Sequence, residues 1–421
     1  MSQLAVPVAF RRPWKATLLR FLAVAGPGLV VAFADTEAGS ITTAATSGAM
    51  FGMKLILLQA LLIVPLFVVQ EMTVRLGTVT GKGHARLIRE NYGLGWAWVS
   101  LGTMLVTNVA ALVTEFAGIA GAAAIFGVNP TLMVCAAAAL LIVVIFSGTY
   151  KRAELAALSL CLLELLFIPA ALAAHPATAS VIREGFFGSQ PLTNHVYLLL
   201  IASNIGAVIM PWMIFYQQSA TVDKGLRPRD LNHARLDTAL GAVATQVIMI
   251  AIIVTTAATL YVHRIQVIDA AHAAMALGPL VGRFAGVAFG AGLIGASLLG
   301  AFVVSLATAW AFGEAFAWPC SLNHSCTKAM RFYGLYAGCV AVAAAVVLVP
   351  RLPLVQITID VEAFNGFVLP IVLGFLLVMI NDKRIIGERR NSWIGNAITL
   401  GLSAVIVVLG IWMAAVTLFH A

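Results

Sequence analysis

Two acidic residues, Asp35 and Glu37, stand in the middle of the first long apolar run of the sequence, at about residues 18–50. An aspartate at bilayer depth costs roughly 2.5–3.5 kcal/mol on insertion scales, so two carboxyl groups this close indicate a purpose. Side chains at i and i+2 point apart on a regular helix. An unwound segment, in contrast, aims both at one point and frees backbone carbonyl oxygens as further ligands. The segment, with the hydroxyl of Ser40 beside it, predicts a cation-binding break in a membrane helix.

A second break is predicted around Pro211, in the sixth apolar run. Proline lacks a backbone N–H and its ring clashes with the preceding turn. The polar residues Asn204, Gln217 and Gln218 lie in the same run. Interrupted helices at corresponding positions of two halves are typical of a transporter binding site.

Composition places the whole chain in a bilayer. Hydrophobic residues make up 61% of the 421 residues and charged residues only 10%, whereas soluble domains have roughly 45–50% apolar and about 25% charged residues. Apolar runs long enough to span a membrane fall near residues 18–50, 53–76, 95–127, 131–149, 154–174, 194–221, 237–262, 284–317, 332–349, 353–381 and 393–419. We therefore expect an all-α polytopic membrane protein with eleven spans and broken helices 1 and 6.

The basic residues follow the same pattern. With the N-terminus in the cytoplasm, 20 of the 25 Lys and Arg residues fall in cytoplasmic segments, as the positive-inside rule requires. The exceptions are Lys54, Arg183, Arg264, Arg283 and Arg351. This distribution accounts for the net charge of +8 without a nucleic-acid partner. It places the C-terminus outside the cytoplasm and predicts a multi-pass protein of the inner (cell) membrane.

The spacing of the two breaks predicts one membrane domain over residues 1–421 with an internal repeat. Repeat one covers about 17–175, repeat two about 192–382, and an extra helix about 393–419. Two five-helix repeats place spans one and six at matching positions, although the halves share no visible sequence similarity.

Several motifs resemble those of the NRAMP family of divalent-metal transporters. They are Gly26-Pro27-Gly28 at the start of span one, the segment Arg75–Lys82 after span two, Gly206–Pro211 in span six, and Asn381–Arg384 with Gly387 after span ten. The resemblance implies a LeuT-like fold with inverted repeats, a metal site between spans one and six, and alternating access.

The departures from the family pattern point to a branch. The family's Asp-Pro-Gly-Asn motif corresponds here to Glu37-Ala38-Gly39-Ser40, with an added acid at Asp35, and its Met-Pro-His motif corresponds to Met210-Pro211-Trp212. A second family histidine falls at about Gln217. This pattern is similar to the NRAMP-related magnesium transporters, which carry an acidic segment before Ala-Gly.

By position in the motifs, the resemblance implies that the metal ligands are Asp35, Glu37, Ser40, the Ala207 carbonyl and the Met210 sulfur. Three further buried polar residues are expected along the ion pathway: Glu115 in span three, Gln217 in span six and Asn365 in span ten. Glu362 is expected at the outer vestibule, and Glu164 in a hydrogen bond between helices.

Ligand chemistry orders the candidate metals. Carboxylates and hydroxyls suit hard Mg²⁺, which keeps part of its water shell, and Mn²⁺ accepts similar oxygens. A thioether favours softer ions, so the Met210 sulfur would favour a softer metal than Mg²⁺ if it faces the site. We expect Mg²⁺ or Mn²⁺ first and Fe²⁺ second. All eight histidines fall in loops or at span ends, so the usual neutral-pH proton carrier is missing from span six. We therefore expect weak or no proton coupling during import by alternating access.

The alternatives are a proton-coupled Mn²⁺/Fe²⁺ importer of the ordinary family type, an organic-solute symporter of the same fold, and a metal-binding sensor without transport. A symporter site directs unpaired backbone donors at a substrate carboxylate, which two acids would repel. An enzyme is not expected, because the spans hold no nucleophile with its base and no His- or Cys-rich site. We expect no cofactor besides the transported cation, and no partner besides the bilayer.

Overall fold

The computed structural model describes residues 20–147, 149–267, 270–349, 352 and 354–419, and this part of the chain is helical. The elements are α2 (Pro27–Ala34), α3 (Ala38–Phe51), η1 (Gly52–Leu55), α4 (Ile56–Thr80), α5 (His84–Tyr92), α6 (Leu94–Ile125), α7 (Pro130–Phe146), α8 (Tyr150–Glu164), α9 (Phe167–Ala173), α10 (Thr178–Phe187), α11 (His195–Val208), α12 (Pro211–Asp223), η2 (Pro228–Asp230), α13 (Leu231–Thr256), η3 (Ala257–Tyr261), α14 (Ala270–Val281), α15 (Arg283–Phe316), α16 (Met330–Val347), α17 (Leu354–Asn381), α18 (Lys383–Ile386) and α19 (Trp393–Phe419).

Each of the eleven predicted apolar runs contains a helix or a pair of helices. By length and apolar composition, nine helices in the described residues qualify as membrane spans. The second half of the first predicted span, α3, continues through η1 into the second span, α4, and together they form one long segment, Ala38–Thr80. Pro130–Phe146 has 17 residues and is counted among the shorter apolar helices. The short helices α5, α10, α14 and α18 were not predicted.

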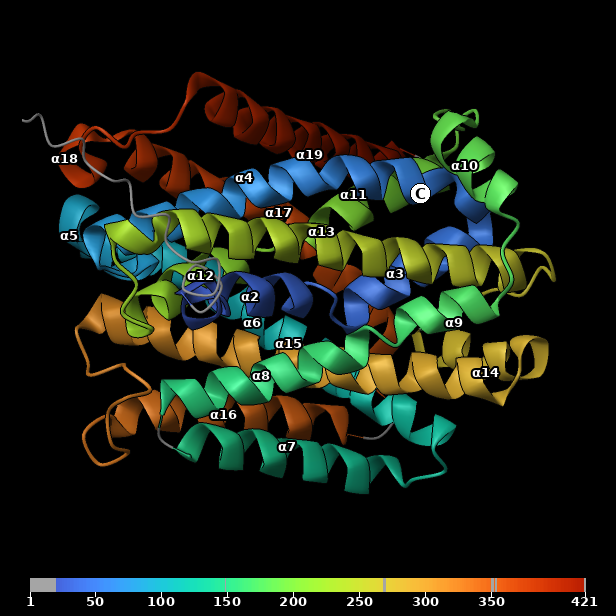
Figure 1. The fold of residues 1–421 in the computed structure, drawn as a ribbon, viewed down its shortest axis with the longest axis horizontal. Helices are drawn as coiled ribbons and strands as arrows, with labels where there is room; N and C mark the ends of the chain where they lie inside the picture. The colour runs from blue at the N-terminus through green and yellow to red at the C-terminus, as the bar shows by residue number, and fades with distance from the viewer. Residues whose placement is uncertain (1–19, 148, 268–269, 350–351, 353, 420–421) are drawn as a thin grey trace, which may run out of the picture.

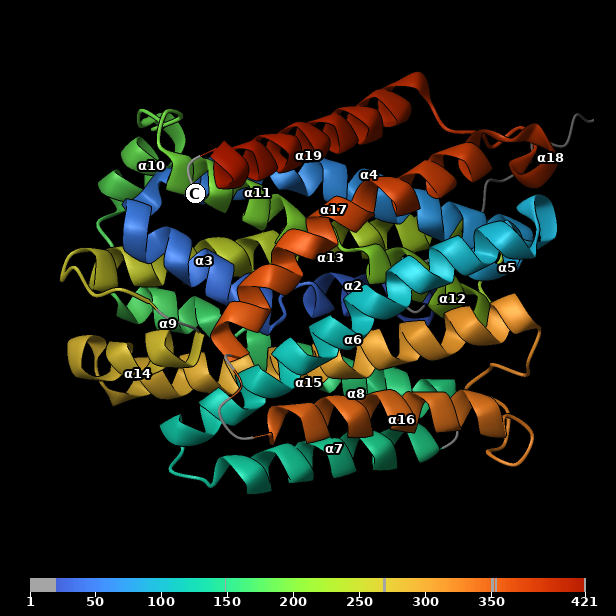
Figure 2. The same cartoon turned by 180° about the vertical axis from the view of Figure 1, so that it is seen from behind.

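The long helices run roughly along the longest axis of the molecule (Figure 1). The short helices α2 and α3 lie in its centre. Helices α8 and α13 pack against α2, whereas α6 and α17 pack against α3 and cross the opposite face of the molecule (Figure 2). The two halves of the first span are therefore surrounded by other helices, away from lipid.

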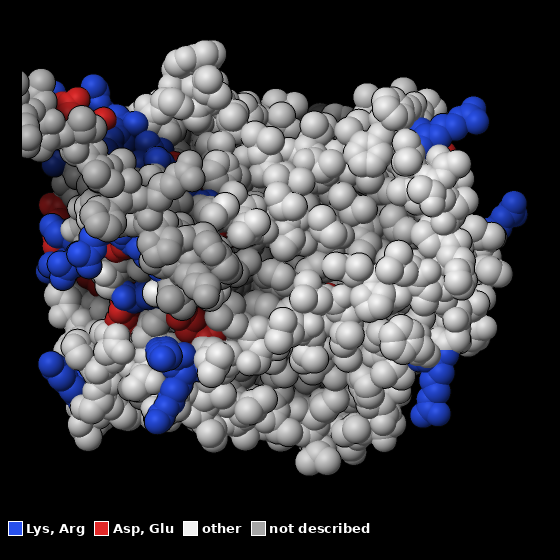
Figure 3. Space-filling model, viewed as in Figure 1, with Lys and Arg blue, Asp and Glu red and all other residues white. Residues whose placement is uncertain are grey.

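The two ends of the bundle differ in charge. We call the end with α5, α18 and the α12–α13 and α15–α16 connections the basic end (Figure 1). Most visible Lys and Arg side chains gather there, few lie at the opposite end, and the belt between is almost free of charge (Figure 3). Lys54 in η1, Arg183 in α10 and Arg283 at the start of α15 belong to the opposite end. The predicted segregation of basic residues is thus present, although Arg351 lies outside the described residues.

Candidate metal site

The first span is broken at the acidic segment, as predicted. Helix α2 ends at Ala34, and Glu37 has an extended backbone (φ −78°, ψ 175°) at the start of α3. The Thr36 N–H bonds back to the Phe33 carbonyl at 2.8 Å, and the Ile41 N–H starts the new ladder on the Glu37 carbonyl at 2.9 Å. The side chains of Asp35 and Glu37 are 3% and 0% exposed. Both carboxyl groups therefore lie at a helix break inside the protein.

Polar contacts fix the start of α2 at the basic end. The N–H groups of Gly26 and Gly28 donate to the Asp237 carboxylate at 3.1 and 2.7 Å. Lys224 donates to the Ala25 carbonyl at 2.6 Å and pairs with Glu154 at 2.8 Å. These bonds satisfy backbone donors that a helix N-terminus leaves free. In this structure they also hold α2, the first half of the first span, against α8, α12 and α13.

The sixth span is broken immediately before Pro211, again as predicted. Ile209 and Met210 have extended backbones, and Pro211 is the first residue of α12, a position where its missing N–H costs nothing. The Met210 sulfur accepts a hydrogen bond from the Trp212 indole at 3.1 Å, and the Met210 N–H donates to the Met213 sulfur at 3.3 Å. The sulfur predicted as a metal ligand is therefore already engaged.

The two breaks meet at Ser40 and Ala207. The Ser40 hydroxyl donates to the Ala207 carbonyl at 2.9 Å, and both residues are fully buried. Ala207 stands at the C-terminal end of α11, where carbonyl groups have no intrahelical partner. The structure therefore brings two of the predicted ligands, Ser40 of span one and Ala207 of span six, into direct contact.

Two further carboxyl groups approach Glu37. Glu115 of α6 and Glu362 of α17 both interact with its side chain, and Glu115 Oε2 also accepts the Ala38 N–H at 3.3 Å. A Cβ added at Gly39 would overlap the Glu362 carboxyl group. Glu362 thus lies directly against the break and not merely in an outer vestibule. The signal for this residue was its acidic type within the tenth span.

A fifth carboxyl group faces the first break from the other side. Glu164, at the end of α8, is fully buried and interacts with Asp35 and Thr36. The Thr36 hydroxyl in turn bonds the hydroxyl of Thr245 on α13 at 2.7 Å. The Glu164 carboxyl group therefore faces the acidic segment, which sequence alone did not indicate, and neither of its oxygens has an aligned hydrogen-bond partner among the described residues.

The five carboxyl groups at this site share a lack of cationic partners. They are Asp35, Glu37, Glu115, Glu164 and Glu362, and none belongs to an ion pair in the described part of the chain. Of their oxygens, only Glu115 Oε2 has a partner by hydrogen-bond geometry, because the neighbouring carboxyl groups approach without aligning. No three of the described His, Cys, Asp and Glu residues form a preformed metal-binding group. A bound cation would therefore draw the carboxyl groups together or reach them through water.

The two predicted pathway amides differ in their surroundings. Gln217 lies further along α12, accepts from the Thr73 hydroxyl at 2.6 Å and donates to the Thr238 hydroxyl at 3.2 Å. Both ends of its side chain are occupied between α4 and α13. The Asn365 side chain is buried on α17, has no aligned hydrogen-bond partner and lies beside Glu362. Asn365 is therefore the amide that stands next to the acidic group.

The described histidines lie at helix ends or in connecting segments, whereas His420 is outside the described residues. His84, the first residue of α5, is the most buried of those that pack near span six. Its Nδ1 lies 3.1 Å from the Gln218 Oε1, and its ring packs edge-on against Phe215. Burial lowers the pKa of His84 from 6.5 to about 4. At neutral pH the ring is uncharged and helps to fix α12 in place.

The fold and the site together define a polytopic membrane protein with two broken helices around a buried acidic centre. Among solved structures, the manganese transporter of Eremococcus coleocola matches with a TM-score of 0.76, at 16% identity over 99% of this chain and 91% of that one. A Na⁺-coupled sialic acid symporter matches with a TM-score of 0.62 at 12% identity, over 91% of this chain and 88% of the other. The fold is thus LeuT-like.

The sequence comparison gives the family. The profile of the natural resistance-associated macrophage protein-like family matches residues 28–416, and the chain belongs to this family, Nramp. A divalent metal cation transporter, MntH, of Ralstonia nicotianae is 29% identical over 95% of this chain and 91% of its own length. The corresponding protein of Aeromonas hydrophila is 25% identical over 96% of each chain.

Proposed function

We propose that this protein moves a divalent metal cation, Mg²⁺ or Mn²⁺, across the inner membrane into the cytoplasm by alternating access. The observation that carries the proposal is the cluster of five buried carboxyl groups without a cationic partner at the first helix break. Carboxylates in a low-dielectric interior are costly unless a cation or proton neutralises them. A passing divalent cation supplies that charge, and the names of the relatives as metal transporters support this reading.

The backbone at the two breaks supports a cation as cargo. Helices α2 and α11 end beside the site with their C-termini, whose carbonyl groups carry partial negative charge. The Ala207 carbonyl is one of these groups and accepts a hydrogen bond from the Ser40 hydroxyl. We propose Asp35, Glu37, Ser40 and Ala207 as oxygen ligands, with Glu362 and Glu115 adding charge around Glu37.

The second break supports a hard, partly hydrated ion. The Met210 sulfur accepts the Trp212 indole N–H, so a softer ion would have to compete for it. Oxygen-only coordination suits Mg²⁺ and Mn²⁺, and Mg²⁺ in particular retains water ligands. The spread of the carboxyl groups, which form no preformed set of three ligands in the described residues, suits an ion that keeps part of its water shell.

The closure of the site supports alternating access as the mechanism. Asp35, Glu37, Ser40 and Met210 are all nearly or fully buried, so a cation enters or leaves only when helices move. The bonds of Gly26, Gly28 and Lys224 hold the inner half of the first span closed at the basic end. We propose that inward release breaks these contacts.

We propose weak or absent proton coupling because the motif resemblance places the family's two histidines at Trp212 and at about Gln217 of this sequence. The alternative is the proton-coupled Mn²⁺/Fe²⁺ importer. The buried carboxyl groups near Glu37 are the feature that would favour it, since they offer other places for a proton.

The test is uptake of Mg²⁺ and Mn²⁺ into proteoliposomes with a pH-sensitive dye in the lumen, for wild type, Glu37→Ala and Asp35→Ala. We expect uptake by wild type, loss in Glu37→Ala and little lumenal acidification. Acidification in step with metal uptake would replace the proposal with the proton-coupled alternative. Unchanged flux in both variants would remove the site assignment, and absence of any metal flux in wild type would remove the transport function.

A further inference from the structure

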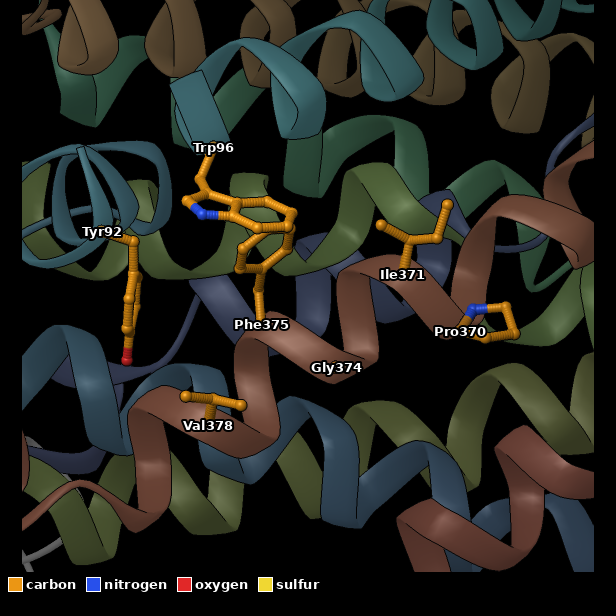
Figure 4. A pocket seen from close by; sticks show the side chains of 7 residues that line it. All are labelled: Tyr92, Trp96, Pro370, Ile371, Gly374, Phe375 and Val378. Atoms are coloured by element: carbon orange, nitrogen blue, oxygen red, sulfur yellow. The ribbon is translucent and has the colours of Figure 1, made fainter. Parts of the chain in front are cut away.

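A groove opens between the start of α6 and the C-terminal half of α17, two helices that lie on the face opposite to that of Figure 1 (Figure 2). It has a volume of about 480 Å³, and its walls include Trp96, Pro370, Gly374, Phe375 and Val378 (Figure 4). The Trp96 and Phe375 rings pack edge to face with centroids 5.9 Å apart. A Cβ added at Gly374 would meet no atom within 4 Å. The groove is therefore an open apolar space with aromatic walls.

The walls of this α6–α17 groove face the bilayer. Trp96 is 56% exposed and Val378 is 54% exposed, and both belong to helices long and apolar enough to span a membrane. Tryptophan and tyrosine are enriched where a membrane protein meets the lipid headgroups. The presence of Trp96 and Tyr92 at one end of the groove therefore marks the level of the interface.

The same end of the groove is polar. The Tyr92 hydroxyl is buried and has no hydrogen-bond partner among the residues that the structure describes. Tyr92 also interacts with the charges of Asp382 and Arg384, at the joint between α17 and α18. A buried hydroxyl without a partner loses hydrogen-bond energy, so a ligand with an acceptor oxygen would stabilise this position.

The segment beyond the polar end is basic. Residues 382–390 carry four basic and two acidic side chains, a net charge of +2. Arg384 pairs with Asp382 at 2.6 Å and Lys383 with Glu388 at 3.0 Å, and the two basic side chains are 82% and 67% exposed. Exposed ion pairs of this kind contribute little and rearrange easily. A membrane-facing basic segment attracts anionic lipid headgroups.

We propose that the α6–α17 groove binds one acyl chain of an anionic phospholipid, with the headgroup at Tyr92, Lys383 and Arg384. An apolar groove that ends at an unpartnered hydroxyl and a basic segment matches the two parts of such a lipid. A neutral soluble ligand would match only one part. The acyl chain would lie against Pro370, an internal proline of α17, the helix that also carries Glu362 and Asn365. It would stabilise α17 at the point where the proline interrupts the backbone hydrogen bonds.

The first test is native mass spectrometry of the purified protein, after exchange into detergent with phosphatidylglycerol or phosphatidylcholine. We expect wild type to retain one phosphatidylglycerol molecule in preference to phosphatidylcholine. Gly374→Leu starts from a position where an added Cβ meets no atom within 4 Å and extends a side chain into the groove, so retention should fall roughly tenfold. The matched control is Gly401→Leu, because Gly401 is exposed on the apolar helix α19 and also has free space around it. Equal retention by Gly374→Leu and wild type would overturn the proposal.

The headgroup is tested separately. Arg384→Gln should reduce the preference for phosphatidylglycerol over phosphatidylcholine, whereas Lys151→Gln, an exposed cation of the α7–α8 corner, should leave it unchanged. An unaltered preference in Arg384→Gln combined with Lys383→Gln would contradict the headgroup assignment.

A measurement on wild type alone removes any dependence on the folding of variants. Phosphatidylglycerol with a photoreactive acyl chain should crosslink to peptides of α17 and the start of α6. Crosslinks spread evenly over all lipid-facing helices would contradict the proposal. A dimer that Gly374→Leu dissociates would likewise overturn it, because the groove would then bind a second copy of the chain.

Discussion

The two helix breaks lie side by side, yet they differ in what they contain. The first carries Asp35 and Glu37, and three more carboxyl groups lie beside it. Almost all of these carboxyl oxygens lack an aligned hydrogen-bond partner among the described residues. The second contains no charge, and its polar atoms are engaged: Ala207 with Ser40, and Met210 with Trp212 and Met213. The comparison indicates that the first break supplies charge to a cation, whereas the second supplies a carbonyl group and a fixed shape.

The largest expected effect comes from removing the charge at the centre of the first break. Glu37→Gln keeps the shape of the side chain, and we expect uptake of Mg²⁺ or Mn²⁺ to fall on the order of 100-fold, because the negative charge that attracts the cation is lost. Proteoliposome uptake measures this. Glu184→Gln, an exposed acid on α10, is the matched control. Equal uptake by Glu37→Gln and wild type would contradict the claim that the first break supplies the charge that binds the cation.

A smaller effect is expected from the charge that α17 adds to the first break. Glu362 presses against Gly39 and interacts with Glu37, so Glu362→Gln should weaken metal uptake by about tenfold. The apparent affinity should change more than the maximal rate, since the residue supports binding. A change in rate alone would indicate that Glu362 acts in helix movement instead.

Helix α12, which begins at the second break, is fixed partly by His84, and this contact gives a pH prediction for stability. The folded-state pKa of about 4 lies below the ordinary 6.5, so the unfolded chain binds the proton more readily. The contribution of the neutral His84 ring to the free energy of unfolding is therefore fully present above pH 6.5. It is lost as the pH drops from 6.5 to about 4, by about 3 kcal/mol at most. Thermal unfolding in detergent over this range measures the loss.

The control for this prediction is a pair of variants. His84→Asn removes the titrating ring and should flatten the pH dependence between 6.5 and 4. His175→Asn, at an exposed residue with a positive φ that asparagine tolerates, should keep it. An unchanged slope in His84→Asn would assign the pH dependence to other groups.

The smallest effect is expected at the second break itself. Met210→Ala removes a sulfur that already accepts the Trp212 N–H, so Mg²⁺ uptake should change by less than about threefold. Met249→Ala, another buried methionine on α13, controls for lost packing. A large loss of Mn²⁺ uptake in Met210→Ala alone would make the sulfur a ligand and reduce the contrast between the breaks.

Sequence determined where the helices form and where they break. These effects are local, because each feature acts on its own segment: apolar runs enter the bilayer, the acids at 35 and 37 disfavour a regular membrane helix, and the proline at 211 interrupts one. They can therefore be predicted from the sequence. The same reasoning placed most basic residues at one end of the bundle. The short helices α5, α10, α14 and α18 were missed because none contains an apolar run of spanning length; α14 is apolar but has only 12 residues.

Only the tertiary structure decided which polar groups meet at the breaks. Glu164, Glu115 and Glu362 come from three different helices, and their approach to the first break depends on packing of helices far apart in the sequence. The engagement of the Met210 sulfur by Trp212 depends on side-chain orientation in a similar way. Hydrophobicity fixes which segments enter the bilayer, but it is nearly equal on all their apolar faces. Close packing and pairing of buried polar groups therefore select the faces that come together.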